Sequence, residues 1–234
     1  METEGDFKLK EAHQLIEKFI YSCSHDLRGP ISSIQGLVRI AEYYPHHEET
    51  SKCLEMIEAC TIKMDRLIHS LEEYLITEQR ELKPEEVNGI ELIDQVVNDY
   101  EDQLTERSIC IIKEVCENNP WITDRYSVHQ IIDHLVSNAI LFSDHNKADR
   151  KITVRIKASD KDSTIEIEDN GVGIAETDKS KIFDVFYRGS TQSEGFGMGL
   201  FLVNHLIKKM GARLSFNSSE KVGSYFKVSI PNTT

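Results

Sequence analysis

The stretch EDNGVGI at residues 168–174 directly follows the alternating run TIEI, so its two glycines come at the end of a predicted strand. A second glycine-rich stretch, GFGMGL at residues 195–200, stands at the start of an apolar run that predicts a helix. Glycine lets a backbone approach a ligand closely, and a helix that begins after glycines presents free N–H groups to a phosphate. Each stretch alone is weak evidence, because glycine pairs also build ordinary turns.

The residues around these glycines exclude two common nucleotide folds. No Gly-Lys-Ser or Gly-Lys-Thr occurs in the chain, so no P-loop is predicted. The residues that follow the first stretch, 175–181, are polar and short. They do not open the long buried helix that a dinucleotide fold requires.

A helix predicted over residues 125–142 supplies a third element of a site. Its polar residues Gln130, His134 and Asn138 are spaced by four and form one stripe, while apolar residues cover most of the remaining surface. A buried stripe needs partners, and a structural hydrogen-bond network would satisfy a single Asn. Because the sequence also predicts two glycine loops, a ligand site is the better interpretation of this polar stripe. An Asn side-chain oxygen suits Mg²⁺ that bridges nucleotide phosphates.

Residues 83–234 are predicted to form one domain of mixed element types. Strands follow one another at residues 151–158 and 164–169 without a helix between them. An open mixed sheet covered by helices on one face therefore fits better than a doubly wound sheet, and the whole chain is expected to be α+β. The further elements are helices at residues 90–104 and 198–210, the latter stopped by Gly211, and strands at residues 108–115 and 226–230.

Residues 1–82 are predicted to form an antiparallel helical hairpin with a turn at Pro45. Two such hairpins are expected to pair into a four-helix bundle, which means a homodimer, because one hairpin cannot cover both of its apolar stripes. The alternative is a hairpin that packs on the rest of its own chain. The predicted seams step by three and four residues: Ile20, Cys23, Leu27, Ile31, Ile34, Val38 and Ala41, then Cys53, Ile57, Cys60, Met64, Leu67, Leu71 and Tyr74.

Charge and composition exclude several classes of protein. The 234 residues include 27 Lys and Arg against 40 Asp and Glu, a net charge of −13. This balance argues against a nucleic-acid partner, which needs clustered basic residues. No apolar run approaches the ~18 residues of a membrane span and no leader is recognised, so a cytoplasmic protein without a membrane segment is expected. Five cysteines without a C-x-x-C pair are interpreted as buried thiols in a reducing compartment.

Five sequence boxes together resemble the sensor histidine kinases of two-component signalling, over residues 10–231. Five boxes in the order and spacing of that family leave little room for chance. They are YSCSHDLRGP at residues 21–30, similar to the H-box of a dimerisation and phosphotransfer hairpin, HLVSNAILFS at 134–143 (N-box), DNGVGI at 169–174 (G1 box), IFDVFYR at 182–188 (F-box) and GFGMGL at 195–200 (G2 box).

The resemblance implies an ATP-binding domain of the Bergerat (GHKL) fold, an α/β sandwich, at residues 83–234. It also implies Mg²⁺, a response-regulator receiver domain as partner, and either a separate cytoplasmic protein or the cytoplasmic core of a longer sensor. Asp169 would accept the adenine amino group and Asn138 would hold Mg²⁺. The other implied nucleotide-binding residues would lie beside the nucleotide or flank and anchor a mobile lid over its phosphates: His134, Gly171, Gly173, Phe183, Phe186, Arg188, Gly195, Gly197, Gly199 and Leu200.

The resemblance also implies that His25 is phosphorylated, and its position on the predicted helix agrees. His25 lies two residues from the seam positions Cys23 and Leu27, about 200° around the helix, so it is expected to face solvent. Asp26 is the family's candidate for orienting the imidazole, which is a competent nucleophile when neutral. Arg28 shares the face of His25 and is interpreted as lowering its pKa before transfer and holding the phosphate afterwards.

Two positions depart from the family pattern and motivate a second hypothesis. His134 stands where the family usually has an Asn, and Leu141 stands where a Lys often reaches toward the phosphates. A missing cation weakens phosphoryl transfer, which depends on positioning and electrostatics. The alternative to an active kinase is therefore a degenerate kinase that serves as a nucleotide-binding dimeric scaffold. A related ATPase or serine kinase is a third hypothesis, against which the segment HDLRGP argues.

Overall fold

The computed structural model describes residues 23, 26–41, 47–117, 120–159, 162–189 and 196–231. The chain forms two compact units that divide between Ile76 and Thr77. The boundary expected between residues 82 and 83 stays a prediction. His25, Gly195, the predicted seam position Ile20 and the turn predicted at Pro45 lie outside the described residues.

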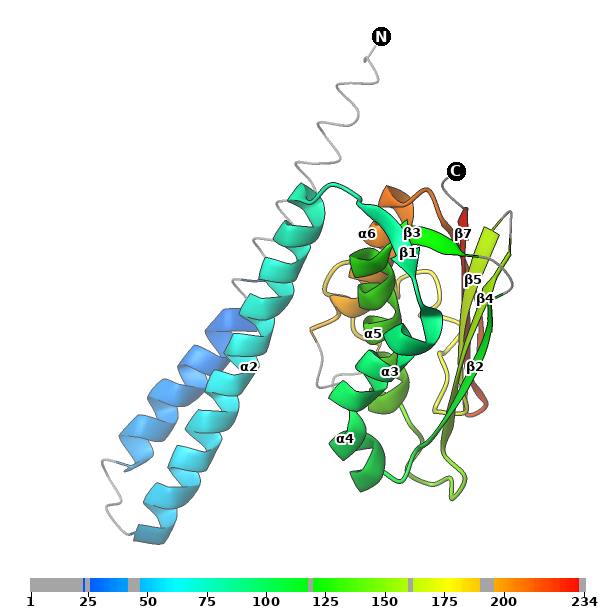
Figure 1. Cartoon of the computed structure of the whole chain (residues 1–234). Helices are drawn as coiled ribbons and strands as arrows, with labels where there is room; N and C mark the ends of the chain where they lie inside the picture. The colour runs from blue at the N-terminus through cyan, green and yellow to red at the C-terminus, as the bar shows by residue number, and fades with distance from the viewer. Residues whose placement is uncertain are drawn as a thin grey trace. The chain divides into compact units, whose positions relative to one another are not determined.

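The described part of the first unit consists of a helix at residues 26–41 and most of α2 (His47–Gln79), whose last three residues belong to the second unit (Figure 1). The seam predicted on α2 is confirmed. Cys53 and Leu67 on this seam are buried, and the seam residues between and after them are half-buried, while the flanking residues are mostly exposed. A stripe that repeats at three and four residues is the pattern by which one helix packs lengthwise on another.

The seam predicted on residues 26–41 is wrong at two positions. Ile31 and Val38 are 41% and 42% exposed, whereas Pro30 and Leu37 are buried. The covered stripe passes through Leu27, Pro30, Ile34, Leu37 and Ala41 and keeps the spacing of three and four. Two apolar stripes lie side by side on this helix, and only contact with the second helix decides which of them is covered.

The second unit is built on a five-stranded mixed sheet, as predicted. Its strand order is β2-β4-β5-β7-β6; β2 and β4 are parallel and the other neighbours are antiparallel. A separate two-stranded sheet pairs β1 with β3, and these two strands and β6 were not predicted. The strands are β1 (Pro84–Val87), β2 (Cys110–Glu117), β3 (Trp121–Asp124), β4 (Lys151–Ala158), β5 (Asp162–Asp169), β6 (Arg213–Ser219) and β7 (Gly223–Pro231).

Helices cover one face of this sheet, as predicted (Figure 1). They are α3 (Gly89–Asp99), α4 (Glu101–Glu106), α5 (Arg125–Leu141) and α6 (Gly199–Lys209). The single helix expected to reach Leu104 is interrupted at Tyr100, whose backbone leaves the helical region (φ −112°, ψ 11°) and whose hydroxyl donates to Asp133 (3.0 Å). The core between the helices and the sheet is aliphatic and includes the fully buried Ile131, Ile132, Val136, Val154, Ile165 and Val228.

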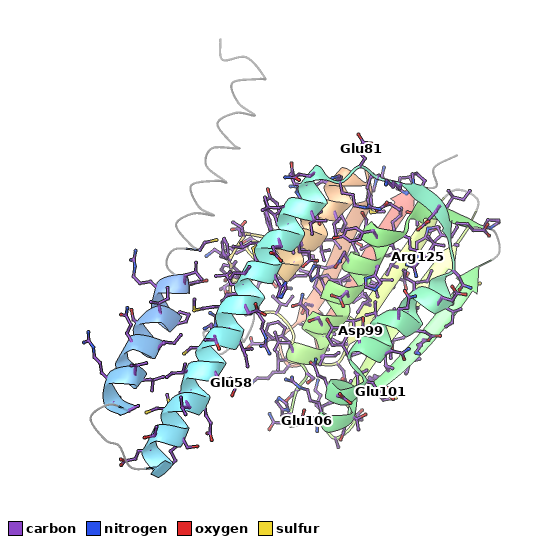
Figure 2. The ribbon with its side chains drawn as sticks, turned by 60° about the vertical axis from the view of Figure 1, so that its left-hand side comes forward. Glu58, Glu81, Asp99, Glu101, Glu106 and Arg125 are labelled. Atoms are coloured by element: carbon purple, nitrogen blue, oxygen red, sulfur yellow. The ribbon has the colours of Figure 1, made fainter. Side chains whose placement is uncertain are left out.

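Charged residues occupy the surfaces that the core leaves in water. Asp99, Glu101 and Glu106 lie on α3 and α4 in Figure 2 and are exposed. Across the sheet, Arg155 forms ion pairs with Glu114 (2.8 Å) and Glu168 (2.7 Å). Cys110 and Cys116 on β2 are also exposed, so the prediction of buried thiols is wrong for these two. Among the described residues, no helix is long and apolar enough to cross a membrane.

Asp124 joins the segment after α2 to the start of α5. Its carboxylate caps α5 by accepting from the N–H of Ser127 (2.9 Å), and it also accepts from the N–H of Lys83 (2.8 Å) and from Arg80 (2.6 Å). Burial alone would raise the pKa of Asp124, but the hydrogen bonds outweigh it and lower the pKa to about 2.

We expect Asp124→Asn to lower the free energy of unfolding by about 2 kcal/mol at pH 7, because the variant loses a carboxylate that the fold stabilises in its charged form. A lowered pKa stabilises the fold above the unfolded value near 3.8 and ceases to do so as the pH falls toward 2. Urea unfolding at several pH values should therefore show the difference from wild type shrinking below about pH 4.

Asp94→Asn is the matched control, because it removes the ion pair between Asp94 and Lys113 (2.6 Å). The side chain of Asp94 is 48% exposed. Such a pair contributes less than ~1 kcal/mol. A deficit in Asp124→Asn that is no larger than that of Asp94→Asn, or that is independent of pH, would contradict the role given to Asp124.

Candidate functional site

The carboxylate expected to accept a hydrogen bond from adenine lies at the end of β5, where the next loop begins. Asp169 ends β5 opposite Ser224 of β7, and its Oδ1 accepts from the N–H of Gly171 (2.7 Å). Burial raises the pKa of Asp169; the backbone hydrogen bonds from Gly171 and Ser224 and the charge of Lys147 oppose this effect. The group is thus a half-buried acceptor whose ionisation depends on its neighbours.

Gly171 and Gly173 allow this loop to pack closely on other parts of the backbone. A Cβ at Gly171 would lie 2.3 Å from the carbonyl oxygen of Phe142, and one at Gly173, where φ is +70°, would lie 2.0 Å from that of Ser219. No side chain larger than hydrogen fits either position without moving the backbone. The structure thus gives both glycines a packing reason, and their predicted role of making room for the nucleotide stays a prediction.

The loop is joined directly to α5. The N–H of Val172 donates to the carbonyl of Phe142 (3.0 Å), and the N–H of Phe142 donates to that of Asn138 (2.9 Å). Asp169 and Asn138, predicted to serve the two ends of one nucleotide, therefore belong to two segments linked by hydrogen bonds. The sequence indicated each of these residues but not Phe142, whose contribution is a backbone carbonyl that no residue pattern marks.

Asn138 presents an unused amide to the start of α6. Its Nδ2 is buried and has no hydrogen-bond partner among the residues that the structure describes, which is costly unless a ligand supplies one. A Cβ at Gly199 would lie 3.5 Å from this Nδ2 and 3.6 Å from Nδ1 of His134. Within the described residues, Met198 makes no side-chain cap at the start of α6, and the first N–H groups of a helix have no partner inside the helix.

The donor set at Asn138 fits a magnesium ion that is held mainly by phosphate oxygens. Mg²⁺ is usually bound by one or two protein oxygens together with substrate phosphates. A half-turn of the carboxamide about its Cβ–Cγ bond exchanges nitrogen and oxygen, so Asn138 can present its oxygen to the ion. No group of three or more His, Cys, Asp or Glu side chains able to hold a metal occurs in the part of the chain that the structure describes.

The segments on either side of residues 190–195 are held to each other. Phe186, with a φ of +62°, donates its N–H to the carbonyl of Gly197 (3.1 Å). A Cβ at Gly197 would lie 2.3 Å from the carbonyl oxygen of Tyr187, so this contact also requires glycine. Phe183 packs edge-on against Phe216 of β6, with ring centroids 5.4 Å apart. The anchoring of a lid by Phe183 and Phe186 stays a prediction.

The remaining predicted residues fall in three places. Leu200 packs on the core of the second unit. Arg188 is half-buried. Lys181 is exposed, and its Nζ lies 6.0 Å from the ring centroid of Tyr187. Asp26, half-buried, and Arg28, exposed, lie in the helix of the first unit.

Comparison with known proteins agrees with this geometry. Residues 15–79 match the model of the His Kinase A (phospho-acceptor) domain, and residues 123–234 match that of the histidine kinase-, DNA gyrase B- and HSP90-like ATPases. The methanogenesis regulatory histidine kinase FilI of Methanothrix harundinacea is 28% identical over 98% of this chain and 26% of its own length. The chain spans about a quarter of the length of the first curated relatives that it matches.

Solved structures share the fold. Histidine kinase ThkA, in complex with the response regulator protein TrrA, superposes with a TM-score of 0.76 at 23% identity over 98% of this chain and 66% of ThkA. Full-length ShkA in complex with AMPPNP superposes with a TM-score of 0.63 at 23% identity over 95% of this chain and 46% of ShkA.

We expect Gly173→Ala to weaken nucleotide binding at least about tenfold, because the added Cβ must displace the loop that carries Asp169. Gly211→Ala is the matched control: its φ of +64° imposes the same backbone strain of about 1–2 kcal/mol, but nothing lies within 4 Å of the new Cβ. Fluorescent-nucleotide titration and thermal unfolding of both variants separate affinity from stability. Equal affinity in the two variants would show that the loop geometry does not matter for binding.

Proposed function

We propose that this chain, which belongs to the sensor histidine kinases and carries their catalytic core, phosphorylates itself on His25 from ATP and passes the phosphoryl group to an aspartate of a response-regulator receiver domain. The observation that supports this most is the buried Nδ2 of Asn138, which has no partner within the described part of the chain and lies 3.5 Å from where a Cβ at Gly199, the first residue of α6, would stand. The match of residues 15–79 to a phospho-acceptor domain supports His25 as the acceptor.

At the nucleotide end, Asp169 accepts a hydrogen bond from the adenine amino group, and the first N–H groups of α6 bind phosphate oxygens. The positive end of the helix dipole favours the same negative charge. Asn138 holds Mg²⁺, which, when bound, neutralises charge on the phosphates. Full-length ShkA, whose fold superposes on this chain, was solved in complex with AMPPNP, which supports a nucleoside triphosphate as the ligand.

At the acceptor end, a neutral imidazole nitrogen of His25 attacks the γ-phosphorus. The bond between this phosphorus and the bridging oxygen breaks, and ADP leaves with the electron pair. Asp26 takes or holds the proton on the other imidazole nitrogen, and Arg28 offers its guanidinium to the transferred group. In the second step a carboxylate oxygen of the receiver domain attacks phosphorus and the bond to His25 breaks. The complex of ThkA with TrrA supports a partner of this kind.

A degenerate kinase that acts as a nucleotide-binding scaffold is the second candidate. Leu141 brings no charge to the end of α5, and the exposed Lys181 lies by Tyr187. This candidate shares the nucleotide site and differs only in the transfer step, so chemistry at His25 separates the two.

We expect incubation with labelled ATP to place label on His25, giving an acid-labile and alkali-stable product that is lost in His25→Gln. Phosphorus bound to an imidazole nitrogen is activated for transfer to a carboxylate, so the label should also pass to a receiver domain. Nucleotide binding without label would favour the scaffold, and acid-stable label would favour a serine kinase.

Arg28→Ala tests the electrostatic part of this mechanism in the same assay, and we expect at least about tenfold slower labelling. Arg39→Ala is its matched control, because Arg39 lies three turns along the same face of the same helix, about 20° from Arg28. Unchanged labelling in Arg28→Ala, or an equal loss in Arg39→Ala, would refute the role of Arg28.

We also propose that the first unit pairs with a second copy of itself. Outside the covered seam, α2 carries Leu54, Ile68 and Leu75, which are 60%, 46% and 51% exposed and are spaced by whole heptads. Ile31 and Val38, also seven residues apart, form a matching exposed stripe on the other helix. Two such stripes beside one seam are what a four-helix bundle buries.

We expect the double variant Leu54→Glu, Ile68→Glu to convert a dimer into a monomer in analytical ultracentrifugation, because it places charges in the proposed interface. Ile62→Glu is the matched control: Ile62 is 46% exposed but lies on the side of α2 opposite the seam, so this variant should remain dimeric. A monomeric wild-type chain would contradict the proposal.

The cytoplasmic location remains part of the proposed function. Because the relatives are about four times longer than this chain, we further propose that it represents the catalytic core of a longer sensor protein. Reaction with ATP and with receiver domains takes place where both are present, which supports the cytoplasmic side.

A further inference from the structure

Lys147, in the connection between α5 and β4, places its ammonium among four backbone carbonyl oxygens. Nζ lies 2.6 Å from the oxygen of Asn170 and 3.4 Å from that of Gly171, in the loop after β5. It lies 3.0 Å from the oxygen of Lys221 and 3.2 Å from that of Val222, in the turn between β6 and β7. Uncharged carbonyls gathered around one positive charge are also how proteins hold a potassium ion.

The two segments that share this charge are in close contact. The N–H of Lys221 donates to the carbonyl of Val172 (2.6 Å). Gly223, at a φ of +140°, leaves no space for a Cβ, which would lie 2.0 Å from the carbonyl oxygen of Asp169. Carbonyl dipoles that converge in this way repel one another unless a cation lies between them. Lys147 supplies that cation.

Asp169 lies next to this junction, and the positive charge of Lys147 affects its pKa. Burial raises the pKa of Asp169, the charge of Lys147 lowers it, and the neighbouring Glu168 raises it. Lys147 thus acts on the adenine-binding carboxylate in two ways: through the loop that carries it and through its electrostatic potential.

We propose that Lys147 is a positioning residue for the nucleotide, whose ammonium takes the place of a bound monovalent cation and joins the loop after β5 to the β6–β7 turn. This inference rests on the proposed function, in which Asp169 binds adenine. Lys147 carries no phosphate contact in this role. Its loss should therefore weaken ADP and ATP alike and leave the transfer step intact.

The test uses the full chain with Lys147→Ala and Lys147→Met. We expect both variants to bind ADP and ATP about tenfold or more weakly, because hydrogen bonds to a charged group are lost, with the labelling rate at saturating ATP nearly unchanged. Lys113→Ala is the matched control: its ammonium pairs with Asp94 (2.6 Å), a carboxylate rather than a set of carbonyls, and this variant should bind normally.

Rescue by a free cation shows whether Lys147 acts through its positive charge or only through the space that its side chain fills. Titrations are run in the chlorides of potassium, ammonium or the bulky N-methylglucamine at equal ionic strength. Potassium or ammonium should restore binding in Lys147→Ala, whose shortened side chain leaves space for the ion. They should not restore it in Lys147→Met, whose side chain fills that space. Wild-type affinity in Lys147→Ala, or a loss that no cation reverses, would overturn the inference.

Thermal unfolding without nucleotide distinguishes failure of this inference from failure of the proposed function. Potassium or ammonium should raise the melting temperature of Lys147→Ala more than that of wild type or Lys147→Met. A wild-type chain that binds no nucleotide would refute the proposed function, while this cation effect would still support the role of the Lys147 ammonium. If the wild-type chain binds nucleotide but the cation effect is absent, the role of the Lys147 ammonium is refuted and the proposed function is not.

Discussion

The second unit depends on close packing of one loop against two other segments of backbone. Residues 169–174 lie between the end of α5 and the β6–β7 turn, and three glycines at these contacts have no space for a side chain: Gly171, Gly173 and Gly223. The carbonyls brought together there are balanced by the ammonium of Lys147. This junction places Asp169, because it fixes the loop that begins with that residue.

The helix α5 serves both the core and the site. Ile131, Ile132 and Val136 are fully buried against the sheet, and His134 and Asn138 lie on the remaining side, where the first residue of α6 approaches them. A helix that is packed on most of its circumference holds its polar side chains rigidly, which is what a preorganised ligand site requires. The hydrogen bonds of Asp124 define where this helix begins.

Each of the two described helices of the first unit carries one covered and one exposed row of apolar side chains. The covered seam on α2 leaves a second row of apolar side chains exposed at heptad spacing, and the helix at residues 26–41 does the same. A chain that exposes two such rows in water has a reason to associate with a copy of itself. The proposed acceptor His25, with Asp26 and Arg28, belongs to the same unit by its place in the chain, so the proposed transfer and the proposed pairing would involve the same unit.

The sequence by itself determined two helices in the first unit and the mixed sheet with helices on one face, because both depend on local periodicity. It also marked Asp169, Asn138 and the glycines as candidate site residues, because each lies in a contiguous box, and their roles stay predictions. It did not decide which apolar stripe of residues 26–41 is covered, since Ile31 and Leu37 satisfy the same spacing rule and only the neighbouring helix distinguishes them. It also left three strands unrecognised, because β1 and β3 are only four residues long and β6 carries only two apolar residues, Leu214 and Phe216, at alternate positions. Lys147 shows the limit most clearly. Its partners are backbone carbonyls more than 20 and more than 70 residues away in the chain, and carbonyls are common to every residue, so only the tertiary fold could reveal what this lysine does.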